Sequence, residues 1–105
     1  MSFHDDKLWQ EAYMAALDLL EATDGQPGDL IDQVRKHALM VVTEVAQAVA
    51  NRDRKFRDIK LRGVVNMIVA LRSLLSLLWA REALADEAFG KLDSAYEALS
   101  GKLPR

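Results

Sequence analysis

Residues 64–80 of this chain read VVNMIVALRSLLSLLWA, and this apolar run limits the possible folds more than any other feature. Thirteen of its seventeen residues are apolar, so the run has to be buried in a membrane, in a protein core or against a partner. A membrane-spanning helix needs about 20 apolar residues, and an arginine at mid-depth, here Arg72, costs about 2.5–3.5 kcal/mol on insertion scales. We therefore expect a core or an interface rather than a membrane span.

The rest of the chain has the composition of a helical globular protein. It contains 105 residues, of which half are apolar and 29% are charged, and Ala, Leu, Glu, Lys and Arg dominate. There is no cysteine, which removes disulfides and thiol chemistry. The first eleven residues, MSFHDDKLWQE, lack the basic-then-apolar order of a secretion signal. These features predict an all-α protein in the cytoplasm.

The spacing of apolar residues predicts four helices, at 6–23, 30–51, 57–84 and 87–100. Asp29 and Asp86 are expected to cap the second and fourth of them. Because the connections are short, the most economical architecture is an antiparallel up-down four-helix bundle, a single domain over residues 1–105. A three-helix alternative fuses the second and third helices through residues 51–57.

The third predicted helix has more apolar surface than one bundle can cover. Its apolar residues fill an arc of about 200°, whereas a helix that faces only its own bundle needs roughly 100°. The surplus predicts self-association, against the alternative that this is simply the central helix of the bundle. Six residues are candidates for core or subunit interface, with the division between the two left open: Met67, Leu71, Leu74, Leu75, Leu78 and Trp79.

No residue pattern in the sequence points to catalysis or to a cofactor. Metal sites in helical bundles use Glu-x-x-His pairs, which are absent here. His4 lies in the N-terminal segment, and His37 stands alone on the flank of the second helix. No glycine-rich phosphate loop is followed by Lys-Ser/Thr. We therefore expect a non-enzymatic protein with no catalytic residue, metal, cofactor or small-molecule substrate.

Two arginines, Arg35 and Arg72, lie on or beside apolar helix faces. A half-buried guanidinium needs a carboxylate or several carbonyl oxygens. Glu44, Glu82 or an acidic residue of a neighbouring subunit are the expected partners. The alternative is that one of the arginines lines a binding site for another molecule.

The segment from Asn51 to Arg62 is strongly basic in an otherwise acidic chain. The net charge is −2, and residues 1–50 carry nine acidic and three basic side chains. The basic side chains of the segment are Arg52, Arg54, Lys55, Arg57, Lys60 and Arg62. They are suited to nucleic-acid phosphates, with Phe56 available for base stacking. The alternative is a solvated connection that balances the acidic first half.

Three segments of the sequence resemble a bacterial four-helix-bundle family, the proteins encoded in 23S ribosomal RNA intervening sequences. The likeness consists of F-x-x-x-x-L-W-Q-E-A at 3–12, Gln33, Val34, Arg35, Lys36 and Ala38 with Val45 and Ala46, and Ala70, Ser73, Leu74 and Leu77. The chain differs from the family pattern at Glu44, Gln47, Ala48, Arg72 and Ser76. The family includes the accessory variability determinant proteins of diversity-generating retroelements.

The resemblance implies a small antiparallel bundle that assembles into a homopentameric ring. It also implies a nucleic-acid role, because the retroelement members work with a reverse transcriptase and its template RNA. Two functional hypotheses follow. The first is a non-enzymatic, homo-oligomeric scaffold or adaptor whose main partner is itself. The alternative is an accessory protein that binds RNA or a nucleic-acid enzyme through residues 51–62.

Overall fold

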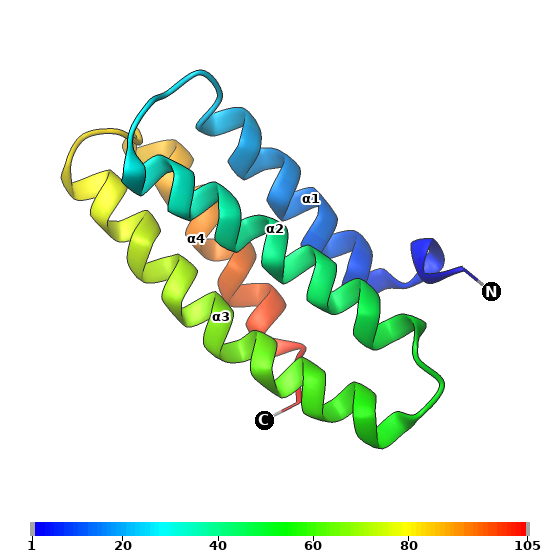
Figure 1. Ribbon diagram of the computed structural model, residues 1–105. Coiled ribbons are helices and arrows are strands. Elements are labelled where there is room, and N and C mark those ends of the chain that lie inside the picture. Colours follow the sequence, from blue (N-terminus) through cyan, green and yellow to red (C-terminus); the bar gives the residue numbers. More distant parts are fainter. Residues whose placement is uncertain (1, 105) are drawn as a thin grey trace.

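The computed structural model describes residues 2–104, which contain one short 3₁₀ turn, four α-helices and no strand (Figure 1). The elements are η1 (Phe3–Asp5), α1 (Lys7–Ala22), α2 (Asp29–Ala50), α3 (Arg54–Ala80) and α4 (Asp86–Gly101). The predicted all-α architecture of four helices is confirmed. The three-helix alternative is wrong, because Asn51 has an extended backbone and separates α2 from α3.

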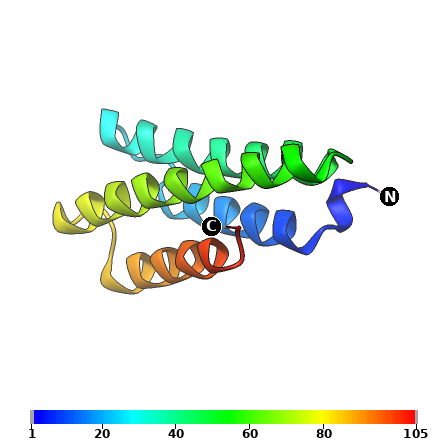
Figure 2. The same cartoon turned by 90° about the horizontal axis from the view of Figure 1, so that it is seen from below.

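Consecutive helices run antiparallel, and α4 returns to pack against α1 (Figures 1 and 2). Within the described part of the chain, α3 lies directly beside α2 and α4, and α1 lies diagonally across the bundle from it. The molecule measures 43 × 24 × 22 Å. Since the 27 residues of α3 span about 40 Å at 1.5 Å per residue, this helix runs along almost the whole length of the bundle.

Each helix buries one apolar stripe whose members are three or four residues apart, as an amphipathic helix does. The core residues of α3 are Leu61, Val64, Ile68, Leu71, Leu75 and Leu78, none more than 6% exposed. From the candidate set for core or interface, the structure thus places Leu71, Leu75 and Leu78 in the core. Met67 and Leu74 are half-buried against the core, and Trp79 is 43% exposed.

Aspartate side chains fix the starts of α1 and α3. Asp6 accepts hydrogen bonds from the backbone N–H groups of Leu8 and Trp9. At the start of α3, Asp53 accepts hydrogen bonds from the backbone N–H groups two and three residues further along. Because Asp53 is the cap, α3 begins three residues before the predicted position 57. Asp29 and Asp86 are not the caps we predicted: each is the first residue of its helix, where a negative charge still favours the positive end of the helix dipole.

The C-terminus of α3 is closed by a left-handed residue that is not glycine. Glu82 has φ of 63°, its N–H donates to the carbonyl of Trp79 over 3.0 Å, and the N–H of Ala83 donates to the carbonyl of Leu78 over 2.9 Å. This is the Schellman arrangement, in which the left-handed position is usually glycine. The helix therefore ends at Ala80, four residues before the predicted end at residue 84.

Candidate interaction surfaces

The side of α3 that faces away from the bundle is exposed and almost without charge. Three large apolar residues stand out on it: Ile59 is 58% exposed, Val69 is 61% exposed and Leu77 is 50% exposed. We call the α3 outward face the exposed set Ile59, Arg62, Gly63, Asn66, Val69, Ala70, Ser73, Ser76, Leu77 and Ala80. Between Gly63 and Ala80, about 27 Å of helix, it carries no charged member.

Arg72 is the one charged residue between Gly63 and Ala80, and its guanidinium turns away from the outward face toward α4. It donates to both carboxylate oxygens of Asp93, over 2.8 and 3.0 Å, and to Glu97 over 3.2 Å. The hydrogen bond from Arg72 lowers the pKa of the Asp93 carboxyl below its usual 3.8, and the pKa of Arg72 is raised in return. Glu44 and Glu82, the partners predicted for Arg72 within the chain, are therefore wrong.

Arg35 is held by oxygen atoms that carry no formal charge. Its guanidinium donates to the backbone carbonyl of Leu20 over 2.9 Å and to the hydroxyl of Thr23 over 2.8 Å. Thr23 is buried, and its hydroxyl donates in turn to the carbonyl of Leu19 over 2.8 Å. Arg35 thus satisfies acceptors at the C-terminus of α1, where a cation also favours the helix dipole, and ties α2 to that end.

The six basic residues predicted to contact nucleic acid lie at one end of the bundle but do not share one surface. Arg52, Arg54, Lys55 and Arg62 are exposed, whereas Arg57 is half-buried. Lys60 is already occupied, since its ammonium group lies 2.7 Å from a carboxylate oxygen of Glu44. Four of the six predicted positions therefore remain open to solvent.

Phe56, the predicted stacking residue, is 43% exposed beside these cations. The ammonium group of Lys60 lies 5.9 Å from the centre of its ring, a distance at which a cation is attracted to the face of an aromatic group. A shallow cavity of about 430 Å³ nearby is lined by Arg54, Lys55, Asp58, Ile59 and Arg62. This cavity combines three cations with one carboxylate and one apolar side chain.

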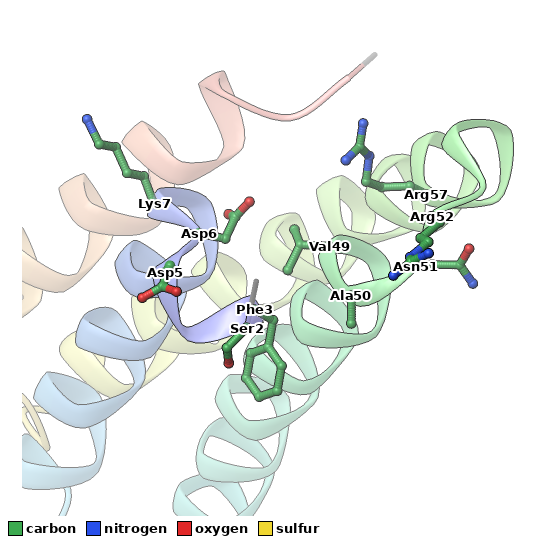
Figure 3. Close-up of a pocket in the computed structure, with 10 residues that line it drawn as sticks. All are labelled: Ser2, Phe3, Asp5, Asp6, Lys7, Val49, Ala50, Asn51, Arg52 and Arg57. Atoms are coloured by element: carbon green, nitrogen blue, oxygen red, sulfur yellow. The ribbon is translucent and has the colours of Figure 1, made fainter.

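A second cavity, of about 700 Å³, opens between η1 and the connection from α2 to α3 (Figure 3). Asp5 and Asp6 line it from the N-terminal side, and Arg52 and Arg57 line it from the other side. Two of the predicted nucleic-acid contacts thus share a cavity with carboxylates of their own chain. That mixture of charges opposes the binding of a phosphate backbone there.

Trp79 makes two contacts across the α3–α4 connection. Its ring stacks on Phe89 with 4.7 Å between ring centres, and its indole N–H donates to Asp86 over 2.7 Å. Both contacts are made within the chain, and 43% of Trp79 remains exposed. The more exposed Leu77 was absent from the predicted set, although it shares the apolar arc of the helix.

The described residues contain no group of three or more His, Cys, Asp or Glu side chains placed to hold a metal ion. His4 stacks on Phe3, and the imidazole of His37 is hydrogen-bonded to the carbonyl of Gln33 in its own helix. Both contacts lie within η1 or α2, so each histidine side chain already has a partner in its own element.

One helix in the described part of the chain, α3, is long and apolar enough to cross a membrane by length and composition alone. Its 18-residue apolar window has a mean hydropathy of 1.7, and 28% of that window is buried. The core helix of a helical bundle passes the same test, so this is weak support for a membrane span. The buried share is similar in the other helices, so what distinguishes α3 is the length of the stretch, from Gly63 to Ala80, over which its exposed residues carry no charge.

No known family model, curated protein or solved structure matches this chain. The likeness to the intervening-sequence proteins thus rests on the residues quoted from the sequence alone.

Proposed function

We propose that this protein is a non-enzymatic, homo-oligomeric four-helix-bundle scaffold or adaptor that assembles through the α3 outward face. The observation that carries the proposal is the exposed, uncharged stretch of α3 between Gly63 and Ala80, on which Val69 is 61% exposed and Leu77 is 50% exposed. Exposed apolar surface of this extent, centred on Val69 and Leu77, is typical of protein–protein interfaces. The cytoplasm is the proposed location.

Burial of the apolar residues supplies the attraction. Fully burying a Val, Leu or Ile side chain contributes about 1.5–3 kcal/mol, so covering the exposed half of Ile59, Val69 or Leu77 contributes about 1 kcal/mol each. The small residues between them, Gly63, Ala70 and Ser73 among others, allow a second helix to approach closely. The resemblance to the intervening-sequence family supports a ring of five copies as the assembly.

Native mass spectrometry of the purified protein, before and after Leu77→Glu, tests the proposal. We expect the natural protein to be a multimer and Leu77→Glu to be a folded monomer, because a charge would be buried in the interface. Met14→Glu is the matched control: Met14 is 54% exposed, but it lies on α1, which does not contact α3. Circular dichroism checks that both variants fold.

A natural protein that is monomeric throughout the micromolar range would contradict self-association itself. If the natural protein is a multimer and Leu77→Glu remains one, the multimer assembles through a different face. If Met14→Glu also dissociates it, the effect of Leu77→Glu is not specific to the α3 outward face.

A second candidate function is that of an RNA-associated accessory protein. It is supported by the exposed cations Arg52, Arg54 and Lys55 beside the half-exposed Phe56. RNA binding of this kind weakens with salt, because each neutralised phosphate of a single strand contributes a slope of about −0.7 in log K against log salt. We expect Arg54→Gln with Lys55→Gln to lower that slope, and Lys36→Gln on α2 to leave it unchanged. Binding unaffected by the double substitution would remove this candidate.

A further inference from the structure

The outward side of α4 differs in charge from the outward sides of the other three helices. Its exposed residues include four charged side chains, Asp86, Glu87, Lys91 and Glu97. The exposed residues of α1 between residues 8 and 20 and of α2 between residues 37 and 50 include no charged side chain. A surface that faces solvent normally carries charges of both signs, as α4 does. The middle parts of α1 and α2, like that of α3, thus have the character of a covered surface.

On α1, the exposed apolar residues gather on the side toward α2. Glu11 and Asp18 mark the opposite side, since their carboxylates pair with Lys102 and Lys91 at α4. Tyr13 and Leu17 lie about 100–160° round the helix from these two acidic residues, at 3.6 residues per turn. Each of them is 42% exposed. They therefore line the surface between α1 and α2, which pack side by side (Figure 1).

On α2, Arg35 marks the side toward α1, because its guanidinium bonds to Leu20 and Thr23 there. Leu39 and Val42 follow on the same side one and two turns later, and Leu39 is 48% exposed. We call the α1–α2 face the exposed or half-buried set Trp9, Tyr13, Leu17, Leu20, Leu39 and Val42. Since α1 lies diagonally across the bundle from α3, one copy can present this face and the α3 outward face at the same time (Figures 1 and 2).

We infer that the α1–α2 face receives the α3 outward face of the next copy, head to tail, and that α4 faces solvent; this inference rests on the proposed self-association. The α3 outward face is the ridge of one helix, and the α1–α2 face is the groove between two helices, so their shapes are complementary. A face that pairs with its own counterpart ends an assembly at two copies. Two different faces that pair with each other continue from copy to copy and can close into a ring, as the proposed five-copy assembly requires.

The areas of the two faces agree with each other and favour a closed ring. The uncharged part of the α3 outward face is about 27 Å long and one helix wide, or about 300 Å². The α1–α2 face is two helices wide and about 17 Å long between Trp9 and Leu20, or about 350 Å². A standard interface covers about 800 Å² on each partner, so one such contact is too small for a stable pair. A copy held on both faces covers about 650 Å², which only a closed ring gives to every copy.

Cysteines on both faces of one chain test the contact, because the natural chain contains no cysteine. With a short bismaleimide linker, we expect Leu77→Cys combined with Leu39→Cys to give a ladder of covalent dimers, trimers and larger species. Either substitution alone should give no more dimer than Met14→Cys, since equivalent residues of neighbouring copies would lie about one bundle width, 22–24 Å, apart. Met14 lies outside the α1–α2 face, in a cavity of about 780 Å³ between α1 and α4. Leu77→Cys combined with Ala98→Cys, exposed on α4, is the matched control and should give no ladder.

A substitution on the α1–α2 face gives an independent measurement by native mass spectrometry. We expect Leu39→Glu to be a folded monomer, because the contact would bury its charge, and Ala98→Glu on α4 to remain a multimer. Circular dichroism checks that both variants fold. If Leu39→Glu does not fold, Leu17→Glu tests the same face from α1.

The outcomes separate this inference from the proposed function. A ladder that requires cysteines on both faces, together with loss of the multimer in Leu39→Glu, supports the head-to-tail contact. A multimer that survives Leu39→Glu, or in which Leu77→Cys links to itself, would overturn that contact but keep self-association. A ladder from Leu77→Cys with Ala98→Cys would overturn it as well, because α4 would then lie in the interface. A natural protein that is monomeric would overturn both.

Discussion

Tyr96 offers the most direct test of how the bundle core is built. Its side chain is completely buried on α4, and within residues 2–104 its hydroxyl has no hydrogen-bond partner. Burial, together with the nearby charge of Asp18, raises the pKa of the Tyr96 hydroxyl well above its usual value of 10. The ring contributes to the core as any aromatic residue would, whereas the hydroxyl opposes folding.

The expected effect of Tyr96→Phe follows from two opposing contributions. Removing an unsatisfied buried hydroxyl removes a desolvation cost of about 1–3 kcal/mol. The space left by one oxygen, at about 24 cal/mol per Å³, returns only about 0.3 kcal/mol of that gain. We therefore expect the variant to be about 1 kcal/mol more stable, with a melting temperature about 4 °C higher.

Urea unfolding at neutral pH measures this difference, and Tyr13→Phe is the matched control because Tyr13 is 42% exposed on α1. The control should change the free energy of unfolding by less than about 0.5 kcal/mol. Above pH 10 the gap between Tyr96→Phe and the natural protein should widen, since the unfolded chain ionises its tyrosine there while the folded chain holds Tyr96 neutral. A Tyr96→Phe variant that is less stable than the natural protein would refute the reasoning and reveal a partner for the hydroxyl.

Two further predictions concern the ends of α3 and its contact with α4. Glu82→Gly should stabilise the protein by about 1 kcal/mol in thermal unfolding, because glycine adopts the left-handed conformation at Glu82 without strain, and Glu82→Ala should bring no such gain. Asp93→Asn should cost about 1 kcal/mol at neutral pH by breaking the paired hydrogen bonds from Arg72. Because the pKa of Asp93 is lowered, this stabilisation is complete above about pH 3.8 and is lost as the pH falls further, so the two proteins should converge in acid.

Much of the fold could be predicted because helix periodicity is a local property of the sequence. Along α4 and just beyond its end, apolar residues recur at steps of three and four, which predicts an inward seam of Phe89, Leu92, Tyr96, Leu99 and Leu103. The structure buries the last four and leaves Phe89 half-buried, stacked on Trp79. Spacing alone gives this result, since it depends on the 3.6-residue turn and on no distant part of the chain.

The ion pairs could not be predicted in the same way. Arg72 pairs with Asp93, 21 residues further along the chain, and which acidic residue of α4 it meets depends on the exact register of two antiparallel helices. That register is set by the connection after Ala80, where the chain turns at Glu82. A left-handed glutamate gives no signal in the sequence, because glycine and asparagine are the residues that mark such a turn. The predicted helix end was therefore four residues too late, and the predicted partners of Arg72 were wrong.

The division of α3 between core and exterior shows what the apolar pattern decides and what it leaves open. The pattern indicated an apolar arc of about 200°, and the structure buries the part of it that contains Leu71, Leu75 and Leu78, while Leu77 and Ala70 at its edge are exposed. Hydrophobic attraction has no direction, so this surplus favours contact with a second copy without choosing its orientation. Leu77→Glu should therefore abolish self-association at any salt concentration, because it removes the apolar contact itself.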